Sequence, residues 1–153
     1  AMIAYYAGDV RRINHFLKVY GFAKAIGEME GLDESTQEII EIAALTHDIG
    51  IKNSEKKYNS SAGNYQQIEG PPEAKKLLEG LGIESGVIDR VCWLIAHHHT
   101  YTDIQGIDYQ ILVEADFLVN FYEDDMSIDS VHSAGGKMFK TLSGKAILNA
   151  IYS

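Results

Sequence analysis

The sequence has few of the features that mark disulfide-stabilised or membrane-spanning proteins. Its only cysteine, Cys92, has no partner for an intramolecular disulfide, which is typical of a reducing compartment. No apolar run approaches the length of a membrane span. These two absences predict a cytoplasmic protein.

Positive charge is also scarce. Lysine and arginine together number 13 against 22 aspartates and glutamates, which gives a net charge of −9 with histidine neutral. Such a surface repels phosphate backbones at long range, so the composition argues against a protein that coats nucleic acid. A small phosphate needs only a few local cations, and it stays a candidate ligand.

Only two prolines interrupt the chain, and the segments around them have the three- and four-residue apolar spacing of amphipathic helices. No segment alternates apolar and polar residues as a strand does. Expected helix starts are Asp9, Asp33 and Ser85 as N-caps, Pro71-Pro72 as a first turn, and Asp108, with two shorter helices in the tail. The sequence therefore predicts a compact, single-domain all-α bundle of about six to seven helices.

The segment 51–70, "IKNSEKKYNSSAGNYQQIEG", is polar and contains clusters of Asn, Ser and Gly. This composition predicts a long loop, and unstructured loops of that length in compact domains tend to be functional. Gly50, immediately before it, is expected to end the preceding helix.

Several histidines and aspartates fall on the apolar faces of the predicted helices. They are His15 in the first helix, His47-Asp48 at the end of the second, His97 or His98 at the end of the fourth, and Asp116 within "VEADFLV". A carboxylate in an apolar stripe is costly to bury unless it is paired or bound to a cation. Four predicted helices each supply a histidine or an aspartate of this kind, and together these residues indicate a metal site.

The position of the adjacent pair His47-Asp48 at a helix end makes it a stronger candidate for metal binding. Neighbouring residues within a helix point about 100° apart. At the last turn, where the chain bends away, both side chains can approach one point. The partial negative charge of a helix C-terminus also favours a cation there.

Four segments, "INHFLKVYGFAKAI", "AALTHDIG", "LIAHHHTY" and "ILVEADFLVN", together resemble the HD-domain superfamily of metal-dependent phosphohydrolases. The resemblance spans about residues 9–120, and the pair His47-Asp48 is its signature. It implies an all-helical fold with a central metal held by His15, His47, Asp48 and Asp116. It also implies hydrolysis of a phosphate ester, most often of a nucleotide or a related molecule.

One departure from the family pattern bears on the number of metal ions. Members with two metals usually carry a further histidine after the His-Asp pair, where this sequence has Gln66 or Gln67. A neutral amide is a poor ligand beside imidazole or carboxylate. We therefore expect one divalent transition metal (Mn, Fe, Co, Ni or Zn) and no second ion. The same departure argues against the oxygen-activating di-iron branch.

Further residues receive roles around this metal. Asp48 is expected to accept a proton from water as well as to bind the metal, and His97 or His98 to protonate the leaving oxygen. Helical phase places His98 inward with Val91 and Ile95. Substrate contacts are expected from Lys52, Lys57 and Gln66, whereas Arg11 and Arg12 are less favoured because they lie nearly a turn before His15.

The sequence predicts one HD-like domain over residues 1–153, with a core at 9–123 and a C-terminal helical extension at 124–153. The apolar positions of the extension either cover the core or contact a second copy of the chain in a homo-oligomer. The expected function is hydrolysis of a small phosphate ester by a metal-activated water. The alternatives are a nucleotide-binding module without turnover and a scaffold with a structural metal.

Overall fold

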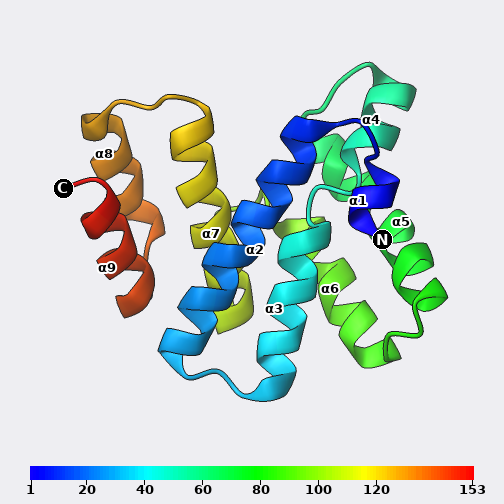
Figure 1. Ribbon diagram of the computed structural model, residues 1–153, viewed down its shortest axis with the longest axis horizontal. Coiled ribbons are helices and arrows are strands. Elements are labelled where there is room, and N and C mark those ends of the chain that lie inside the picture. Colours follow the sequence, from blue (N-terminus) through cyan, green and yellow to red (C-terminus); the bar gives the residue numbers. More distant parts are fainter.

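The computed structural model describes all 153 residues, which form nine helices and no strand (Figure 1). The helices are α1 (Met2–Tyr5), α2 (Val10–Glu30), α3 (Glu34–Thr46), α4 (Ile51–Tyr58), α5 (Gly63–Gly80), α6 (Ser85–His97), α7 (Ile107–Glu123), α8 (Ile128–Met138) and α9 (Leu142–Ile151). The prediction of an all-α fold is confirmed. The structure adds two helices, α1 and α4, to those expected from the sequence. None of the helices is both long and apolar enough to cross a membrane.

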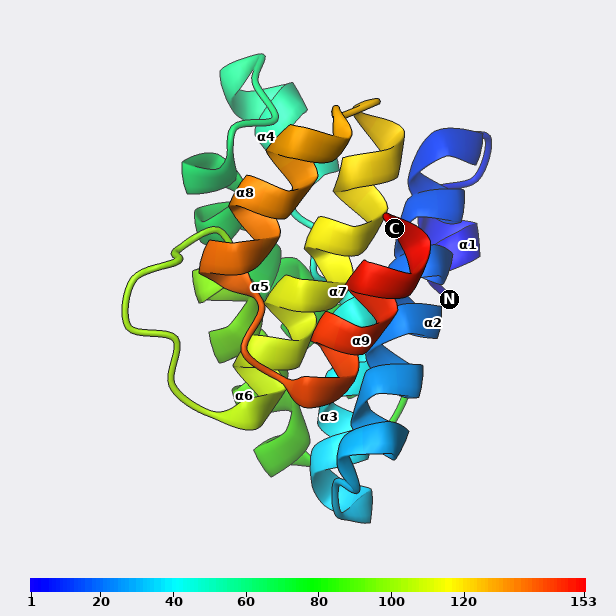
Figure 2. The same ribbon diagram turned by 90° about the vertical axis from the view of Figure 1, so that its left-hand side faces the viewer.

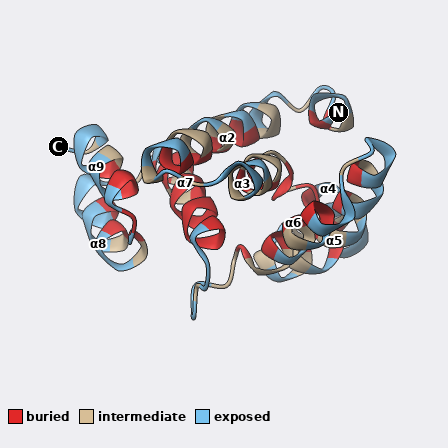
Figure 3. Ribbon diagram, turned by 90° about the horizontal axis from the view of Figure 1, so that it is seen from below, coloured by how far each residue is buried: buried red, intermediate tan, exposed pale blue.

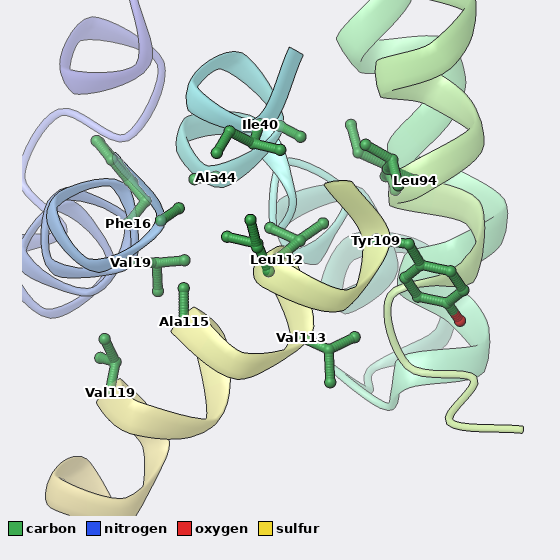
Figure 4. Close-up of a cluster of buried hydrophobic side chains, with 14 of the residues drawn as sticks. Phe16, Val19, Ile40, Ala44, Leu94, Tyr109, Leu112, Val113, Ala115 and Val119 are labelled. Carbon is green, nitrogen blue, oxygen red and sulfur yellow. The ribbon is translucent and has the colours of Figure 1, made fainter. Parts of the chain in front are cut away.

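Helix α7 lies at the centre of the packing and is buried along most of its length (Figure 3). It packs against α2 and α3, α3 also packs against α6, and α6 in turn packs against α5. From α7, Leu112 and Ala115 point toward Val19 of α2 and toward Ile40 and Ala44 of α3 (Figure 4). The helices that meet in this core carry, or are directly followed by, the histidines and aspartates singled out from the sequence.

Local capping explains where the first long helices begin. The side chain of Asp9 accepts a hydrogen bond from the Arg12 backbone N–H, and Asp33 does the same for Thr36, as predicted. The prediction of Ser85 as a cap is wrong by one residue, because Glu84 accepts from the Val87 N–H and Ser85 is already helical.

The prediction of a loop over 51–70 is wrong, because only residues 59–62 lie between α4 and α5. Helix α4 buries Ile51 and Ser54 and turns its remaining, mostly charged, residues outward, so it lacks an apolar stripe. Helix α5 buries polar and glycine positions such as Gln66, Glu69 and Gly70 at helical spacing. A search for apolar periodicity misses helices of this kind.

Pro71 and Pro72 lie inside α5 and not in its first turn, which corrects a second prediction about this segment. A proline has no N–H, so the carbonyl groups of Gln67 and Ile68 lose their usual helical partners. Helix α5 continues through this point because it is held on both sides, by α4 and by α6. Tertiary packing therefore outweighs the local preference of proline for a helix start.

The C-terminal extension is fixed to α7 by one buried carboxylate. Glu114 accepts hydrogen bonds from the backbone N–H groups of Lys140 (2.6 Å) and Thr141 (2.9 Å) and from the Thr141 hydroxyl (2.5 Å). Of the apolar tail positions, Val131 and Phe139 join the core, whereas Ile128 and Leu142 are exposed. Between α6 and α7, the segment 98–106 extends outward as a loop (Figure 2).

Gly50 permits a close approach between the start of α4 and α5. Helix α3 already ends at Thr46, before the stop predicted at Gly50, and the Gly50 φ of −71° is not that of a left-handed C-cap. A Cβ at this position would lie 2.6 Å from the Gly70 nitrogen and 2.7 Å from the Gln66 carbonyl oxygen. Both atoms belong to the backbone and have little room to move.

We expect Gly50→Ala to lower the free energy of unfolding by about 1–3 kcal/mol, because the added methyl group overpacks this contact. Gly21→Ala is the matched control, because a Cβ at Gly21, within α2, meets nothing within 4 Å. That variant should gain about 0.5–1 kcal/mol from helix propensity. Urea unfolding in the presence of a chelator measures both, and equal stability of Gly50→Ala and the parent chain would refute the close-approach argument.

Candidate metal centre

The turn that carries His47 and Asp48 is held by two tyrosines at the N-terminal end of the chain. Helix α3 ends at Thr46 and α4 begins at Ile51, so both residues lie in the short connection. The Tyr6 hydroxyl donates to the carbonyl oxygens of Asp48 (2.8 Å) and Ile49 (3.2 Å). The Tyr5 hydroxyl lies 3.4 Å from the same Ile49 oxygen. These bonds fix the backbone from which the two side chains project.

Four ligand-type atoms from α2, the α3–α4 turn and α7 converge in the core. His15 Nε2 lies 3.3 Å from His47 Nε2 and 3.4 Å from Asp48 Oδ2. Asp116 Oδ1 lies 3.3 Å from His15 Nε2 and 3.6 Å from His47 Nε2. His47 Nε2 is also 3.4 Å from Asp48 Oδ2.

These separations match the spacing of ligands around one ion. Neighbouring ligands bound at about 2.1 Å and at angles of about 90–110° are about 3.0–3.4 Å apart. The atoms that His15, His47 and Asp48 offer all lie within 4.8 Å of one another. Two imidazole nitrogens and two carboxylate oxygens form a donor set that suits a divalent transition metal.

The second ring nitrogen of each histidine near this cluster is already bonded. His15 Nδ1 lies 2.9 Å from Glu123 Oε2, His47 Nδ1 lies 2.8 Å from the Ala44 carbonyl, and His98 Nδ1 lies 2.8 Å from the Ile95 carbonyl. These partners accept hydrogen bonds only, so each Nδ1 carries a proton and donates it. When the ring is neutral, its lone pair is therefore at Nε2, on the side of the cluster.

Opposite charges stabilise one another in this buried cluster. Burial lowers the pKa of His47, but the carboxylates of Asp48 and Asp116 outweigh burial and raise that pKa well above its usual value. Burial disfavours ionisation of Asp48, yet His47 and His98 hold its pKa well below the usual range. Without a metal, His47 therefore keeps a proton at Nε2 to higher pH than free histidine does. A cation must displace that proton to bind.

A second group of ligand-type residues lies near the other carboxylate oxygen of Asp48, Oδ1. His98 is buried, and its Nε2 lies 3.6 Å from Asp48 Oδ1 without a hydrogen-bond partner. With His99, these residues form another set that could hold a metal ion. His99 Nε2 lies 3.1 Å from Gln66 Oε1, and burial, followed by the neighbouring His98, lowers the pKa of His99 to about 4.

Three residues given roles from the sequence lie away from this cluster. The His97 ring stacks on Trp93 with 4.0 Å between ring centres, and its Nδ1 lies 2.6 Å from the Trp93 carbonyl. Lys52 donates to the Tyr5 carbonyl at 3.1 Å. Lys57 forms an ion pair with Glu69 at 2.7 Å.

A cavity of about 420 Å³ opens beside the cluster. Its lining consists of Asp9, Arg11, Arg12, His15, Asp48, Ile51, Glu55, Ser61, Gln66, Asn120 and Glu123. Arg12 is held by Asp9 (2.8 Å) and Glu55 (2.5 Å), whereas Arg11 is exposed and forms no ion pair within the chain. The cations beside the cluster are thus arginines of α2.

Some residues around the centre were not singled out from the sequence, although their spacing carried a signal. Asn120 and Glu123 follow Asp116 by four and seven residues, which places them on one face of α7. Asn120 donates to Asp116 Oδ1 at 3.0 Å. Arg12 precedes His15 by three residues, a spacing that makes two helical residues neighbours. For His99, next to an inward His98, no such signal existed.

The HD domain family model matches residues 12–131, which is most of the chain. The protein belongs to this family, within the HD-domain superfamily of metal-dependent phosphohydrolases, and the resemblance drawn from its motifs is confirmed. No curated protein and no solved structure gives a significant match to the sequence.

Glu123 holds the Nδ1 proton of His15, so its removal should weaken metal binding. We expect Glu123→Gln to lower the affinity for a divalent metal by about 10- to 100-fold, the usual effect of losing such a partner. Competition with a chromophoric chelator measures this affinity. Glu28→Gln is the control, because Glu28 is an exposed residue of α2 that pairs only with Lys24. Unchanged affinity in Glu123→Gln would contradict the role of the carboxylate.

Proposed function

We propose that the protein is a metal-dependent hydrolase of a small phosphate ester. The observation that carries this proposal is the convergence of His15, His47, Asp48 and Asp116, with the free nitrogens of both imidazoles turned inward. On this proposal these four residues hold one divalent transition metal, chosen among Mn, Fe, Co, Ni and Zn. Such an ion supplies Lewis-acid polarisation of a phosphoryl oxygen and lowers the pKa of water.

Asp48 and His98 are the proposed proton-transfer residues. Asp48 turns Oδ2 toward the two imidazoles and Oδ1 toward His98, so Oδ1 is the atom that accepts the proton of the attacking water. In its form with both ring nitrogens protonated, His98 gives the Nε2 proton to the leaving oxygen. We assign this role to His98 and not to His97, whose ring lies against Trp93.

We also propose that the second set of residues binds no metal. Gln66 donates its Nε2–H to the Ser61 carbonyl at 2.7 Å, which turns its Oε1 toward His99. An amide oxygen only accepts, so His99 must carry its proton at Nε2. With the Nε2 lone pair absent, His99 is a poor metal ligand, and Gln66 acts by fixing the tautomer. Its contact with substrate stays a prediction.

Arg11 and Arg12 are the proposed phosphate-binding residues. Both line the cavity beside His15, and a guanidinium presents several donors to phosphate oxygens. Lys52 and Lys57 remain the alternative, but neither lines the cavity.

The function is tested by phosphate release from nucleoside mono-, di- and triphosphates and from generic phosphate esters, with each metal in turn. Turnover is expected from the parent chain, whereas Asp48→Ala should lose both bound metal and activity while its circular dichroism stays helical. Retained turnover in Asp48→Ala would refute the assignment. Tight nucleotide binding without phosphate release would favour a binding module, and metal content with neither property would favour a scaffold.

The source of the phosphate-binding charge is tested by single substitutions. We expect Arg11→Ala and Arg12→Ala to raise KM by about tenfold or more, because each removes charged hydrogen bonds to phosphate. Lys56→Ala, an exposed change on α4, is the charge control and should leave KM unchanged. A larger effect from Lys52→Ala or Lys57→Ala than from the arginine variants would transfer the role to the lysines.

A further inference from the structure

The lining of the cavity beside the metal centre is unusually polar for a small-molecule site. Ile51 is the only apolar residue in it, and no phenylalanine, tyrosine or tryptophan takes part. Ligand pockets are ordinarily lined mostly by apolar and aromatic side chains, with a few polar groups for orientation. The composition of this wall therefore carries information about the substrate, on the premise that the protein is the phosphohydrolase proposed above.

A nucleobase is a flat, largely apolar ring system, which proteins commonly bind by stacking on an aromatic side chain. The aromatic residues of the neighbouring elements are engaged with one another. Tyr58 stacks on Tyr65 with 4.2 Å between ring centres, and Tyr101 packs edge-on against Phe117 at 5.2 Å. None of these four rings lines the cavity, and the one ring that does, the His15 imidazole, is assigned to the metal, so no aromatic ring is left for a base to stack on.

The polar groups of the wall suit hydroxyl groups. Glu55 uses Oε1 to hold Arg12, which leaves Oε2 available on a side chain that is 46 % exposed. Asn120 uses its amide nitrogen to hold Asp116, which leaves its oxygen to accept. Ser61 adds a hydroxyl that both donates and accepts. These groups line the same cavity as the arginines assigned to phosphate.

We propose that the site selects a compact phosphate monoester rich in hydroxyl groups, of the sugar phosphate class, over nucleotides. On this proposal Arg11 and Arg12 bind the phosphate and Glu55 accepts a hydrogen bond from a sugar hydroxyl. The nucleotide expectation rests on the family resemblance alone. The cavity wall favours a different member of the same class of esters.

The test compares three esters on the metal-loaded protein: ribose 5-phosphate, AMP and phenyl phosphate. Ribose 5-phosphate and AMP share the phosphate-bearing sugar and differ in the base, whereas phenyl phosphate has an aromatic ring and no hydroxyl. We expect kcat/KM for ribose 5-phosphate to exceed that for each of the others by about tenfold or more. An equal or higher value for AMP or for phenyl phosphate overturns this inference and leaves the proposed hydrolase intact. Release of phosphate from none of the three overturns this inference, and release from no ester of the wider panel above overturns the proposed hydrolase as well.

A substitution separates the hydroxyl contact from the support that Glu55 gives to Arg12. Loss of that support affects every ester equally, because all share the phosphate. In Glu55→Gln the one amide oxygen is taken by Arg12, and an NH2 group replaces the second acceptor oxygen. KM for ribose 5-phosphate should therefore rise about threefold more than KM for phenyl phosphate, which has no hydroxyl to lose an acceptor. Glu38→Gln, an exposed change on α3 away from the cavity, is the matched control. Equal rises for both esters would overturn the contact.

Discussion

The interaction on which the rest depends is the pairing of buried carboxylates with buried imidazoles. Asp116 and His47 lie in the core, where an isolated charge is strongly disfavoured. Each is stabilised by groups from other elements, and a cation bound there would balance the two carboxylates further. The packing of α2, α3 and α7 therefore serves two ends, because the contacts that close the core also bring these side chains together.

Apolar periodicity predicted most of this fold because most of its helices are amphipathic. The same periodicity exposed the site, since Asp116 is conspicuous within an apolar stripe and His98 falls in phase with Val91 and Ile95. The pair His47-Asp48 was conspicuous at a helix end. These signals are local, so one sequence suffices to read them.

What the sequence did not predict depends on contacts between distant residues. Helix α4 is polar, and α5 buries Gln66 and Glu69, so both resemble loops until their neighbours are known. The lysines of α4 looked free to bind phosphate, but Lys57 is held by Glu69, twelve residues away. The position of Arg12 in the cavity wall was not foreseen, because a distance of nearly one turn along a helix was taken for separation, whereas it brings residues onto one face.

The side-chain amide of Gln66 determines which ring nitrogen of His99 carries the proton. The Ser61 carbonyl accepts from Gln66, and this bond decides which end of the amide faces His99. The amide oxygen then requires a proton on His99 Nε2, and the lowered pKa of His99 keeps the ring neutral. His98, one residue earlier, instead donates its Nδ1 proton to the Ile95 backbone carbonyl and turns its Nε2 toward Asp48. Two adjacent imidazoles thus bond through different ring nitrogens because their hydrogen-bond partners differ.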